Sequence, residues 1–367
     1  VRSVGKESDI VNKEMYTWLD NGKTSLTLKP EGTASIIRAF VQNNIGASSP
    51  INRLYYIDAF FRRERPQKGR FRQFHQLGIE AIGSENPEQD AEVVMAAYSL
   101  CKHLGLTNIV TKINSIGSSK ARHSYSAALK EFLIPHANQL SETSKNRMDS
   151  NPLRILDTKI PDEIELIQDA PLISDFLDDE DREHFDAVLA MMDSLNLKYE
   201  VDPRLVRGLD YYNRTTFEML SSDLGSQNAV LGGGRYDSLV QDLGGKPTPA
   251  VGFAAGIERL ILCMDQSNQS TRDAGPDVYI CLVGDDAIKA SAPTARQLRD
   301  AGLTVIQETL RRSMKSQLRD ANRLGARWAI IIGEDEVESN TVQLKSMEKE
   351  GEQVEVPSGD LLKHIKK

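Results

Sequence analysis

The sequence has 367 residues, of which 45 are Lys or Arg and 53 are Asp or Glu, giving a net charge of −8 at pH 7. Such a length suggests two or three domains, and 40% hydrophobic and 27% charged residues are ordinary for a globular protein. The acidic balance gives no global argument for nucleic-acid binding, so any polyanion site must be a local patch. No apolar run reaches the length of a membrane span and no signal peptide is visible, so we expect a cytoplasmic protein without membrane contact. Three distant cysteines indicate a reduced protein without a cysteine metal site: Cys101, Cys263 and Cys281.

The first part of the chain predicts a largely antiparallel sheet. Residues 13–33 are typical of a hairpin, with the turn at Asp20-Asn21-Gly22. Helices are expected at 33–43 and 88–103, and strands at 53–64, 72–83 and 108–117. From Ser119 to Leu197 the sequence becomes helical and polar, with breaks at "SNPLR" and "KIPDE". Strand patterns resume at 198–202, 215–220 and 229–237, which makes the middle section a helical insertion in an α+β domain.

A second, smaller domain is expected after a linker. Residues 265–276, "DQSNQSTRDAGP", have the composition of a linker. Beyond it, short apolar strands alternate with helices, and a short hairpin and a final helix follow. This pattern predicts a small α/β domain. One of its helices carries basic residues at helical spacing, opposite an apolar stripe of Met314, Leu318 and Ala321: Arg312, Lys315, Arg319 and Arg323.

One hairpin of this acidic chain is strongly basic. Between the strand-like ends of the stretch "FFRRERPQKGRFRQFHQLGIE", residues 60–80, lie one acid, Glu64, and six cations: Arg62, Arg63, Arg65, Lys68, Arg70 and Arg72. Its loop is more basic than one small ligand requires, which favours a longer polyanion backbone as partner. A solvated, charged turn is the alternative, because exposed charge runs are common.

Alternation along the two strands of this hairpin predicts a polar binding face. One face of the second strand carries Phe74, Gln76, Gly78 and Glu80. One face of the first strand carries Tyr56, Asp58, Phe60 and Arg62. Antiparallel pairing could bring Arg62 close to Gln76, so that a cation, an amide, a gap and a carboxylate share one surface. Such a surface suits a small zwitterion beside a phosphate.

Three further stretches are candidate parts of a site. In "LKPEGT", Glu31 could cap the following helix or meet an ammonium group. "LVRGLDYYNRTTFE" places Arg207 beside Gly208 and two tyrosines, and its alternative is a surface turn with buried aromatic residues. "AVLGGGRYD" and "AVGFAAGIERL" place glycines where a strand passes close to something flat or bulky, the latter just before Arg259. A tight packing contact is the alternative there.

Several common catalytic motifs are missing from the sequence. There is no phosphate loop, dinucleotide fingerprint, zinc-type Cys/His spacing or nucleophile elbow. Catalysis by positioning and cationic stabilisation therefore fits better than covalent catalysis.

Together these stretches resemble the class II aminoacyl-tRNA synthetases, and specifically the histidyl-tRNA synthetase family. "FRRERPQKGRFRQFHQLGIE" resembles motif 2, which spans about residues 53–83, and "AVGFAAGIERL" resembles motif 3, about residues 250–263. "LVRGLDYYNRTTFE" and "GGGRYD" resemble the two histidine-specific segments, of which the first discriminates better. The likeness covers nearly the whole chain. It implies ATP-dependent ligation of L-histidine to tRNA(His) through histidyl-adenylate, with release of pyrophosphate and AMP.

The resemblance also implies roles for individual residues. The catalytic arginines would be Arg62, Arg207 and Arg259. Histidine would be bound by Glu31, Gly32, Thr33, Arg62, Gln76, Glu80, Arg207, Tyr211 and Tyr212. ATP would be bound by Arg62, Glu64, Arg70, Phe74, Tyr236 and Arg259. Mg²⁺ would bridge the outer phosphates, through ligands that the sequence does not identify.

The same resemblance implies a domain plan. The class II catalytic core would span residues 1–268, with the helical insertion at 119–197, and an α/β anticodon-binding domain would span 276–367. Motif 1, which builds much of the dimer interface in class II enzymes, is expected upstream of Val1, so a homodimer is implied by the family alone. Two rival interpretations are a non-catalytic paralogue, such as the regulatory subunit of ATP phosphoribosyltransferase, and an RNA-binding protein without ATP chemistry. The three arginines and the second domain favour the enzyme.

Overall fold

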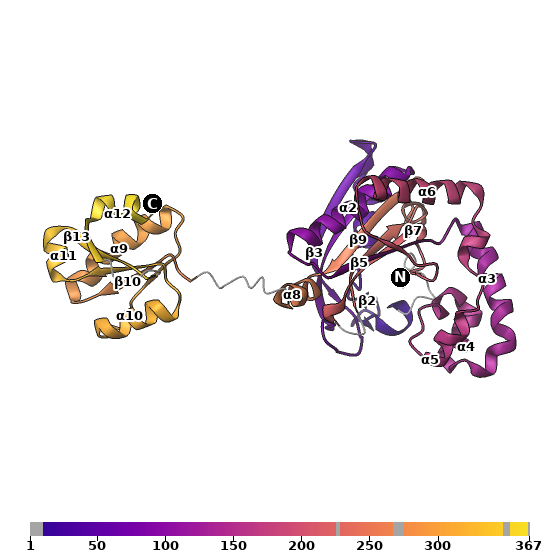
Figure 1. Ribbon diagram of the computed structural model, residues 1–367, viewed down its shortest axis with the longest axis horizontal. Helices are drawn as coiled ribbons and strands as arrows, with labels where there is room; N and C mark the ends of the chain where they lie inside the picture. Colours follow the sequence, from indigo (N-terminus) through magenta and orange to yellow (C-terminus); the bar gives the residue numbers. More distant parts are fainter. Residues whose placement is uncertain (1–9, 225–227, 267–274, 348–352, 366–367) are drawn as a thin grey trace. The chain divides into compact units, whose positions relative to one another are not determined.

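The computed structural model describes residues 10–224, 228–266, 275–347 and 353–365. The chain forms two compact units, residues 1–269 and 270–367, each with its own sheet (Figure 1). Among the described residues, no helix combines the length and the apolar character needed to cross a membrane.

A seven-stranded sheet organises the first unit. Its strand order is β3-β4-β9-β8-β7-β5-β6, and only the β5–β6 pair is parallel. The strands are β3 (Asn52–Phe61), β4 (Gln73–Ile82), β5 (Ile109–Ser115), β6 (Glu200–Val201), β7 (Asn213–Ser221), β8 (Ala229–Arg235) and β9 (Ala250–Gly256). Strands far apart in the sequence become neighbours in this order, which lets β4, β8 and β9 carry parts of one site. The antiparallel sheet predicted from sequence is confirmed.

Two hydrophobic cores hold helices against this sheet. In the first, α2 (Pro87–His103) and α6 (Asp179–Ser194) pack on sheet residues such as Phe217 and Phe253. In the second, α1 (Thr33–Gln42) and α3 (Ser119–Leu133) pack with buried tyrosines that belong to the candidate site. The short α7 (Leu239–Asp242) and α8 (Ile257–Gln266) complete this unit. The second core therefore joins the helical insertion directly to the site.

The insertion between β5 and β7 contains α3, α4 (Glu142–Ser150), α5 (Pro161–Ile167) and α6 (Figure 1). Polar caps start three of these helices: Ser118, Ser141 and Asp178 each accept a hydrogen bond from a main-chain N–H of the first turn. Prolines begin the 3-10 turn η4 (Pro152–Ile155) and helix α5, where the sequence predicted breaks.

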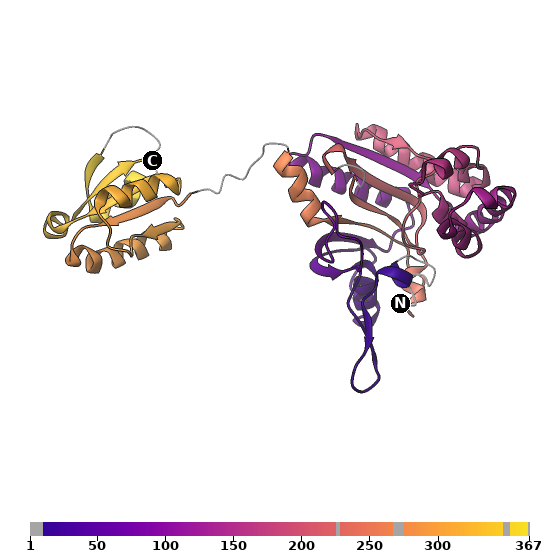
Figure 2. The same cartoon turned by 90° about the horizontal axis from the view of Figure 1, so that it is seen from below.

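A thin hairpin of β1 (Thr17–Leu19) and β2 (Ser25–Thr27) projects from the first unit (Figure 2). Its predicted turn forms, and the carboxylate of Asp20 accepts a hydrogen bond from Thr24 N at 2.8 Å. Every residue of both strands is exposed, including Trp18 and Leu19.

The second unit is a five-stranded sheet in the order β11-β10-β12-β13-β14. Its strands are β10 (Val278–Leu282), β11 (Val305–Gln307), β12 (Trp328–Ile332), β13 (Thr341–Ser346) and β14 (Gln353–Pro357). Helices α9 (Asp285–Asp300) and α12 (Leu361–Ile365) pack on one face, and α10 (Met314–Arg323) packs on the other. The small α/β domain predicted from sequence is thus confirmed, whereas α11 (Glu334–Ser339) was not predicted.

The basic helix of this unit follows the predicted pattern. Met314, Leu318 and Ala321 of α10 pack against the sheet, while Lys315, Arg319 and Arg323 are exposed. Arg312 precedes the helix and forms ion pairs with Glu308 at 2.7 Å and Asp320 at 2.8 Å.

Candidate active site

Three arginines from distant parts of the chain line one cavity of about 440 Å³. Arg62 follows β3, Arg207 lies between β6 and β7, and Arg259 lies in the first turn of α8. The same cavity is lined by four more of the residues named from sequence: Glu64, Arg70, Phe74 and Gln76. Cations gathered around one concave surface make a site for a polyanion of small size.

Arg62 is fixed by its neighbours at the end of the hairpin. Its Nε donates to the carbonyl of Pro30 at 2.9 Å, and its guanidinium lies 5.2 Å from the ring centroid of Phe74. Arg62 lies across from Arg72, whose carbonyl accepts its N–H at 2.9 Å, and Gln76 lies across from Asp58. The predicted approach of Arg62 to Gln76 through strand pairing is therefore wrong, because the loop closes the hairpin in another register. Both side chains nevertheless line the cavity.

The basic side chains of the hairpin lie in two places, some lining the cavity and some exposed outside it. Arg62 and Arg70 line the cavity, and Arg70 forms an ion pair with Glu64 at 2.7 Å. The remaining cations of the hairpin are exposed: Arg63, Arg65, Lys68 and Arg72. The hairpin can therefore meet two separate anions, one inside the cavity and one outside.

Arg207 reaches the cavity over a glycine of the sheet. Its guanidinium pairs with Glu218 of β7 and lies 5.7 Å from the ring centroid of Tyr212. A Cβ on Gly232 of β8 would collide with the guanidinium, so only glycine leaves room for this flat group.

Arg259 faces the same cavity in an environment that disfavours its charge. Burial and the nearby Arg70 lower the pKa of Arg259. An anion between these cations would relieve that repulsion.

Glu80 forms a second, buried centre beside the cavity. Its carboxylate accepts a hydrogen bond from Thr33 Oγ1 at 2.7 Å and another from the hydroxyl of Tyr236. Burial raises the pKa of Glu80 to about 8, although the two hydroxyl donors lower it. Gly252 lies across from Glu80, and a Cβ there would collide with the carboxylate.

Aromatic side chains pack together near Glu80. The ring centroids of Tyr211 and Tyr212 lie 4.7 Å apart, and Tyr236 lies 5.5 Å from Tyr211 and 6.3 Å from Tyr212. The sequence placed Tyr236 in the adenine and phosphate region. In the structure its hydroxyl donates to Glu80, and Tyr236 is not among the residues that line the cavity of the three arginines.

Tyr56 also belongs to this group, although the sequence did not single it out as a site residue. It is buried, and a Cβ on Gly32 or on Gly78 would collide with its ring. The signal was present, since Gly78 leaves a gap between Gln76 and Glu80 on the predicted binding face. A neighbouring side chain fills part of it.

Glu31 and Gln76 offer acceptors of different kinds. The carboxylate of Glu31 accepts the N–H of Ala34 at 3.1 Å at the start of α1, as a helix cap does, and burial raises its pKa. Gln76 Oε1 is buried and has no hydrogen-bond partner among the residues that the structure describes. A buried acceptor of this kind suits an ammonium or N–H donor.

Comparison with known proteins decides the family. The model of the histidyl-tRNA synthetase family matches residues 1–260, and that of an anticodon-binding domain matches residues 277–367. The chain belongs to the histidyl-tRNA synthetase family. It is 47% identical to the histidine–tRNA ligase of Neisseria meningitidis serogroup A, across 98% of this chain and 84% of the relative. It is 46% identical to that of Halothermothrix orenii, across 100% of this chain and 87% of the relative.

A solved structure agrees with this assignment. The apo histidyl-tRNA synthetase of Staphylococcus aureus superposes with a TM-score of 0.80 at 34% identity, over 96% of this chain and 87% of that one. The fold is therefore a class II catalytic domain with a C-terminal anticodon-binding domain. The activity is that of a histidine–tRNA ligase, which uses ATP and acts on histidine and tRNA(His).

Proposed function

We propose that the arginine-lined cavity holds ATP and that the buried group around Glu80 holds histidine, so that histidyl-adenylate forms where they meet. The observation that carries this proposal is the convergence of Arg62, Arg207 and Arg259 on one cavity that also contains Gln76. Gln76 and Glu80 share a face of β4, so the nucleotide cavity and the amino-acid pocket adjoin.

The first step brings two anions together. The carboxylate of histidine attacks the α-phosphorus of ATP, a new P–O bond forms and pyrophosphate leaves. Arg62 bridges the carboxylate and the α-phosphate, Arg207 approaches the α-phosphate from the other side, and Arg259 holds the γ-phosphate. No side chain has to accept or donate a proton, so fixed cations can supply most of the stabilisation. Glu64, Arg70 and Phe74 line the same cavity and complete the nucleotide site.

Histidine is recognised at both of its ends. Glu31, Thr33 and Gln76 hold the α-ammonium group, and Gly32 lets the ring of Tyr56 pack beside them. Glu80 and Tyr212 contact the imidazole nitrogens, with Tyr211 alongside. Each carboxylate oxygen of Glu80 already accepts a hydrogen bond from one hydroxyl, that of Thr33 or that of Tyr236. Each oxygen has a second lone pair that can accept an N–H of the imidazole. A ring without nitrogen would leave these buried polar groups without a new partner, which penalises the wrong substrate.

Mg²⁺ fits the cavity as a partner of the phosphates. No group of three or more potential metal-ligating side chains occurs among the described residues. Mg²⁺ commonly takes one or two carboxylates together with substrate phosphates, and Glu64 and Glu218 line the cavity near Arg259. These two carboxylates would hold the ion, which would neutralise charge on the outer phosphates.

The exchange of labelled pyrophosphate into ATP tests the proposed function. We expect exchange only when L-histidine is present, because the attacking carboxylate must be delivered by a bound amino acid. The measurement compares histidine with the other amino acids at equal concentration. Equal exchange with every amino acid, or none with histidine in folded protein, would contradict the proposal.

The exposed cations of the hairpin serve the second step. There the terminal ribose hydroxyl of the tRNA attacks the aminoacyl carbonyl, and AMP leaves. We infer that the outer side of the loop contacts the acceptor stem, because Arg65 and Lys68 are exposed while Arg62 and Arg70 line the cavity.

Replacing Arg65 and Lys68 by alanine should raise KM for tRNA about 10-fold at moderate salt, and the difference from the wild type should shrink at high salt. Pyrophosphate exchange, which needs no tRNA, should change less than about 2-fold. Aminoacylation and exchange assays at two salt concentrations measure both effects. A parallel loss of exchange would place these residues in the nucleotide site instead.

We further infer the domain plan and the assembly. Residues 1–268 form the catalytic core with the insertion at 119–197, and residues 276–367 bind the anticodon stem-loop. A homodimer is supported by exposed apolar side chains: edge strand β3 carries Tyr55 and Ile57, 75% and 61% exposed, and the β1–β2 hairpin carries Trp18, Leu19 and Leu26. A cytoplasmic location agrees with substrates that reside there.

A further inference from the structure

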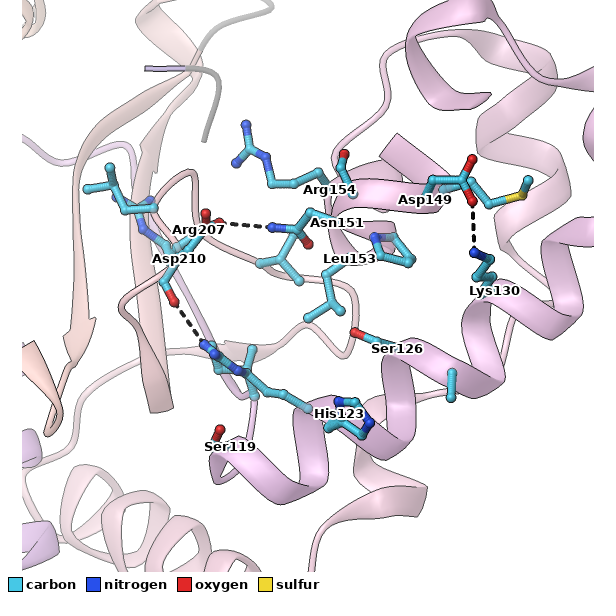
Figure 3. A pocket seen from close by; sticks show the side chains of 18 residues that line it. Ser119, His123, Ser126, Lys130, Asp149, Asn151, Leu153, Arg154, Arg207 and Asp210 are labelled. Carbon is cyan, nitrogen blue, oxygen red and sulfur yellow. Dashed lines mark hydrogen bonds and ion pairs between the residues drawn. The ribbon is translucent and has the colours of Figure 1, made fainter. Parts of the chain in front are cut away.

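A second cavity lies between the helical insertion and the segment that carries Arg207. It measures about 520 Å³ and is lined by α3, by the junction of α4 and η4, and by Val206, Arg207, Leu209 and Asp210 (Figure 3). Arg154 and Arg207 line both this cavity and the ATP cavity. The wall between the two cavities is therefore formed partly by the insertion.

Arg122 of α3 binds the main chain of that segment. Its Nη1 donates to the carbonyl of Asp210 at 3.1 Å and to the carbonyl of Tyr212. Residues 205–212 form no strand and no helix, so these carbonyls have no regular ladder to satisfy them. The partly buried guanidinium supplies donors in a fixed plane. Burial lowers its pKa, and the nearby carboxylate of Asp210 offsets only part of that shift.

A second part of the insertion binds the same residue. Asn151, between α4 and η4, donates through Nδ2 to Asp210 Oδ1 at 2.8 Å, and Figure 3 shows its side chain directed at Asp210. Arg154 packs on Gly208, where a Cβ would lie 3.2 Å from Arg154 Nη1. Contacts from α3 and from the α4–η4 region thus meet at three positions of one short segment, Gly208, Asp210 and Tyr212.

These contacts act next to the groups that the reaction uses. Arg207 precedes the held segment, Tyr211 lies within it, and the carbonyl held by Arg122 belongs to Tyr212 itself. A shift of this main chain would move the arginine and both tyrosines together. We propose that Arg122, assisted by Asn151, is a positioning residue for the adenylation reaction, through which the insertion fixes Arg207 and the tyrosines. This proposal rests on the function proposed above for those residues.

The test uses steady-state pyrophosphate exchange with R122A, R122K and N151A in the whole chain. R122A should lower kcat/KM for histidine about 10- to 100-fold, because small displacements of reacting groups are costly. R122K should lie between R122A and the wild type, since an ammonium group cannot reach two carbonyls with the same geometry. N151A should lower kcat/KM for histidine about 3- to 10-fold. The matched control is K130A, because Lys130 lies on the same helix and lines the same cavity but pairs with Asp149. Its kcat/KM should stay within about 2-fold of the wild-type value.

A double-mutant cycle separates positioning from a general loss of stability. If Arg122 acts through Arg207, R122A should lower kcat/KM for histidine by a much smaller factor in the R207A background than in the wild type. Purely structural damage would instead give additive losses and would overturn the proposal, as would exchange by R122A within about 2-fold of the wild type. If R122A does not fold, R122K and N151A in the R207A background give the same comparison. Absence of histidine-dependent exchange in the wild type would refute the underlying function and is distinguishable from these results.

Discussion

Replacing Arg207 by alanine should lower kcat for pyrophosphate exchange about 10³-fold and should change the dissociation constant of histidine less than about 10-fold. The reason is that the guanidinium is directed at charge that develops during phosphoryl transfer, whereas most contacts to histidine come from other residues. Exchange kinetics give kcat, and calorimetric titration with histidine in the absence of ATP gives the binding constant.

A control for this variant is R53A. Arg53 also pairs with a glutamate, Glu92, but the pair lies on the surface, with an N–O distance of 3.0 Å. Surface pairs contribute little, so exchange by R53A should stay within about 2-fold of the wild type. A loss of histidine binding by R207A as large as the loss of kcat would assign Arg207 to amino-acid binding and not to the transition state.

Replacing Glu80 by glutamine should reduce discrimination for histidine about 100-fold. The comparison substrate is 2-thienylalanine, whose ring has a similar size but lacks both nitrogens. The expected change is a lower kcat/KM for histidine with little change for the analogue, because the buried carboxylate no longer matches the imidazole. The control variant is E92Q, the same chemical change at an exposed ion pair. An unchanged preference in E80Q would remove Glu80 from the recognition group.

The same variant should also change how stability depends on pH. Burial raises the pKa of Glu80 from an ordinary value of 4.5 to about 8, so between these values the folded state keeps a proton that the unfolded state releases. The contribution of Glu80 to the free energy of unfolding is therefore full below about pH 4.5 and is lost as pH rises toward 8. Relative to E80Q, the wild type should lose roughly 2–4 kcal/mol between pH 5 and pH 8.5. Thermal unfolding of both proteins at the two pH values measures this difference.

The sequence predicted the main elements because their signals are local. Alternation marked β3 and β4, and the proline-containing breaks "SNPLR" and "KIPDE" marked limits within the helical insertion. The apolar stripe of α10 was visible for the same reason, since Met314 and Leu318 repeat at helical spacing. Helix α11 was missed because its six residues are too few to show a period. The strands of the β1–β2 hairpin were predicted, yet none of their residues is buried.

Relations between distant residues were harder to predict. Alternation along a strand predicts which side chains share a face, but the register between two strands depends on the loop that joins them. For this reason Arg62 was predicted near Gln76, whereas it lies across from Arg72. The contact of Tyr236 with Glu80 joins residues 156 positions apart, and no local pattern reports it. The convergence of the three arginines was expected from the family resemblance and not from spacing. The contacts of Arg122 were not expected at all, because a polar helix in an insertion looks like a solvated one.

The glycines opposite Glu80 and beneath Arg207 restrict how this catalytic surface could evolve. At Gly252 and at Gly232 even one methyl group would collide with a functional side chain. At Gly252 the carbonyl of Ile79 also blocks a methyl group, so a descendant that accepted a different amino acid could not begin by adding bulk there. At Gly232 added bulk would displace the guanidinium of Arg207, and thereby disturb the old reaction before a new substrate was gained.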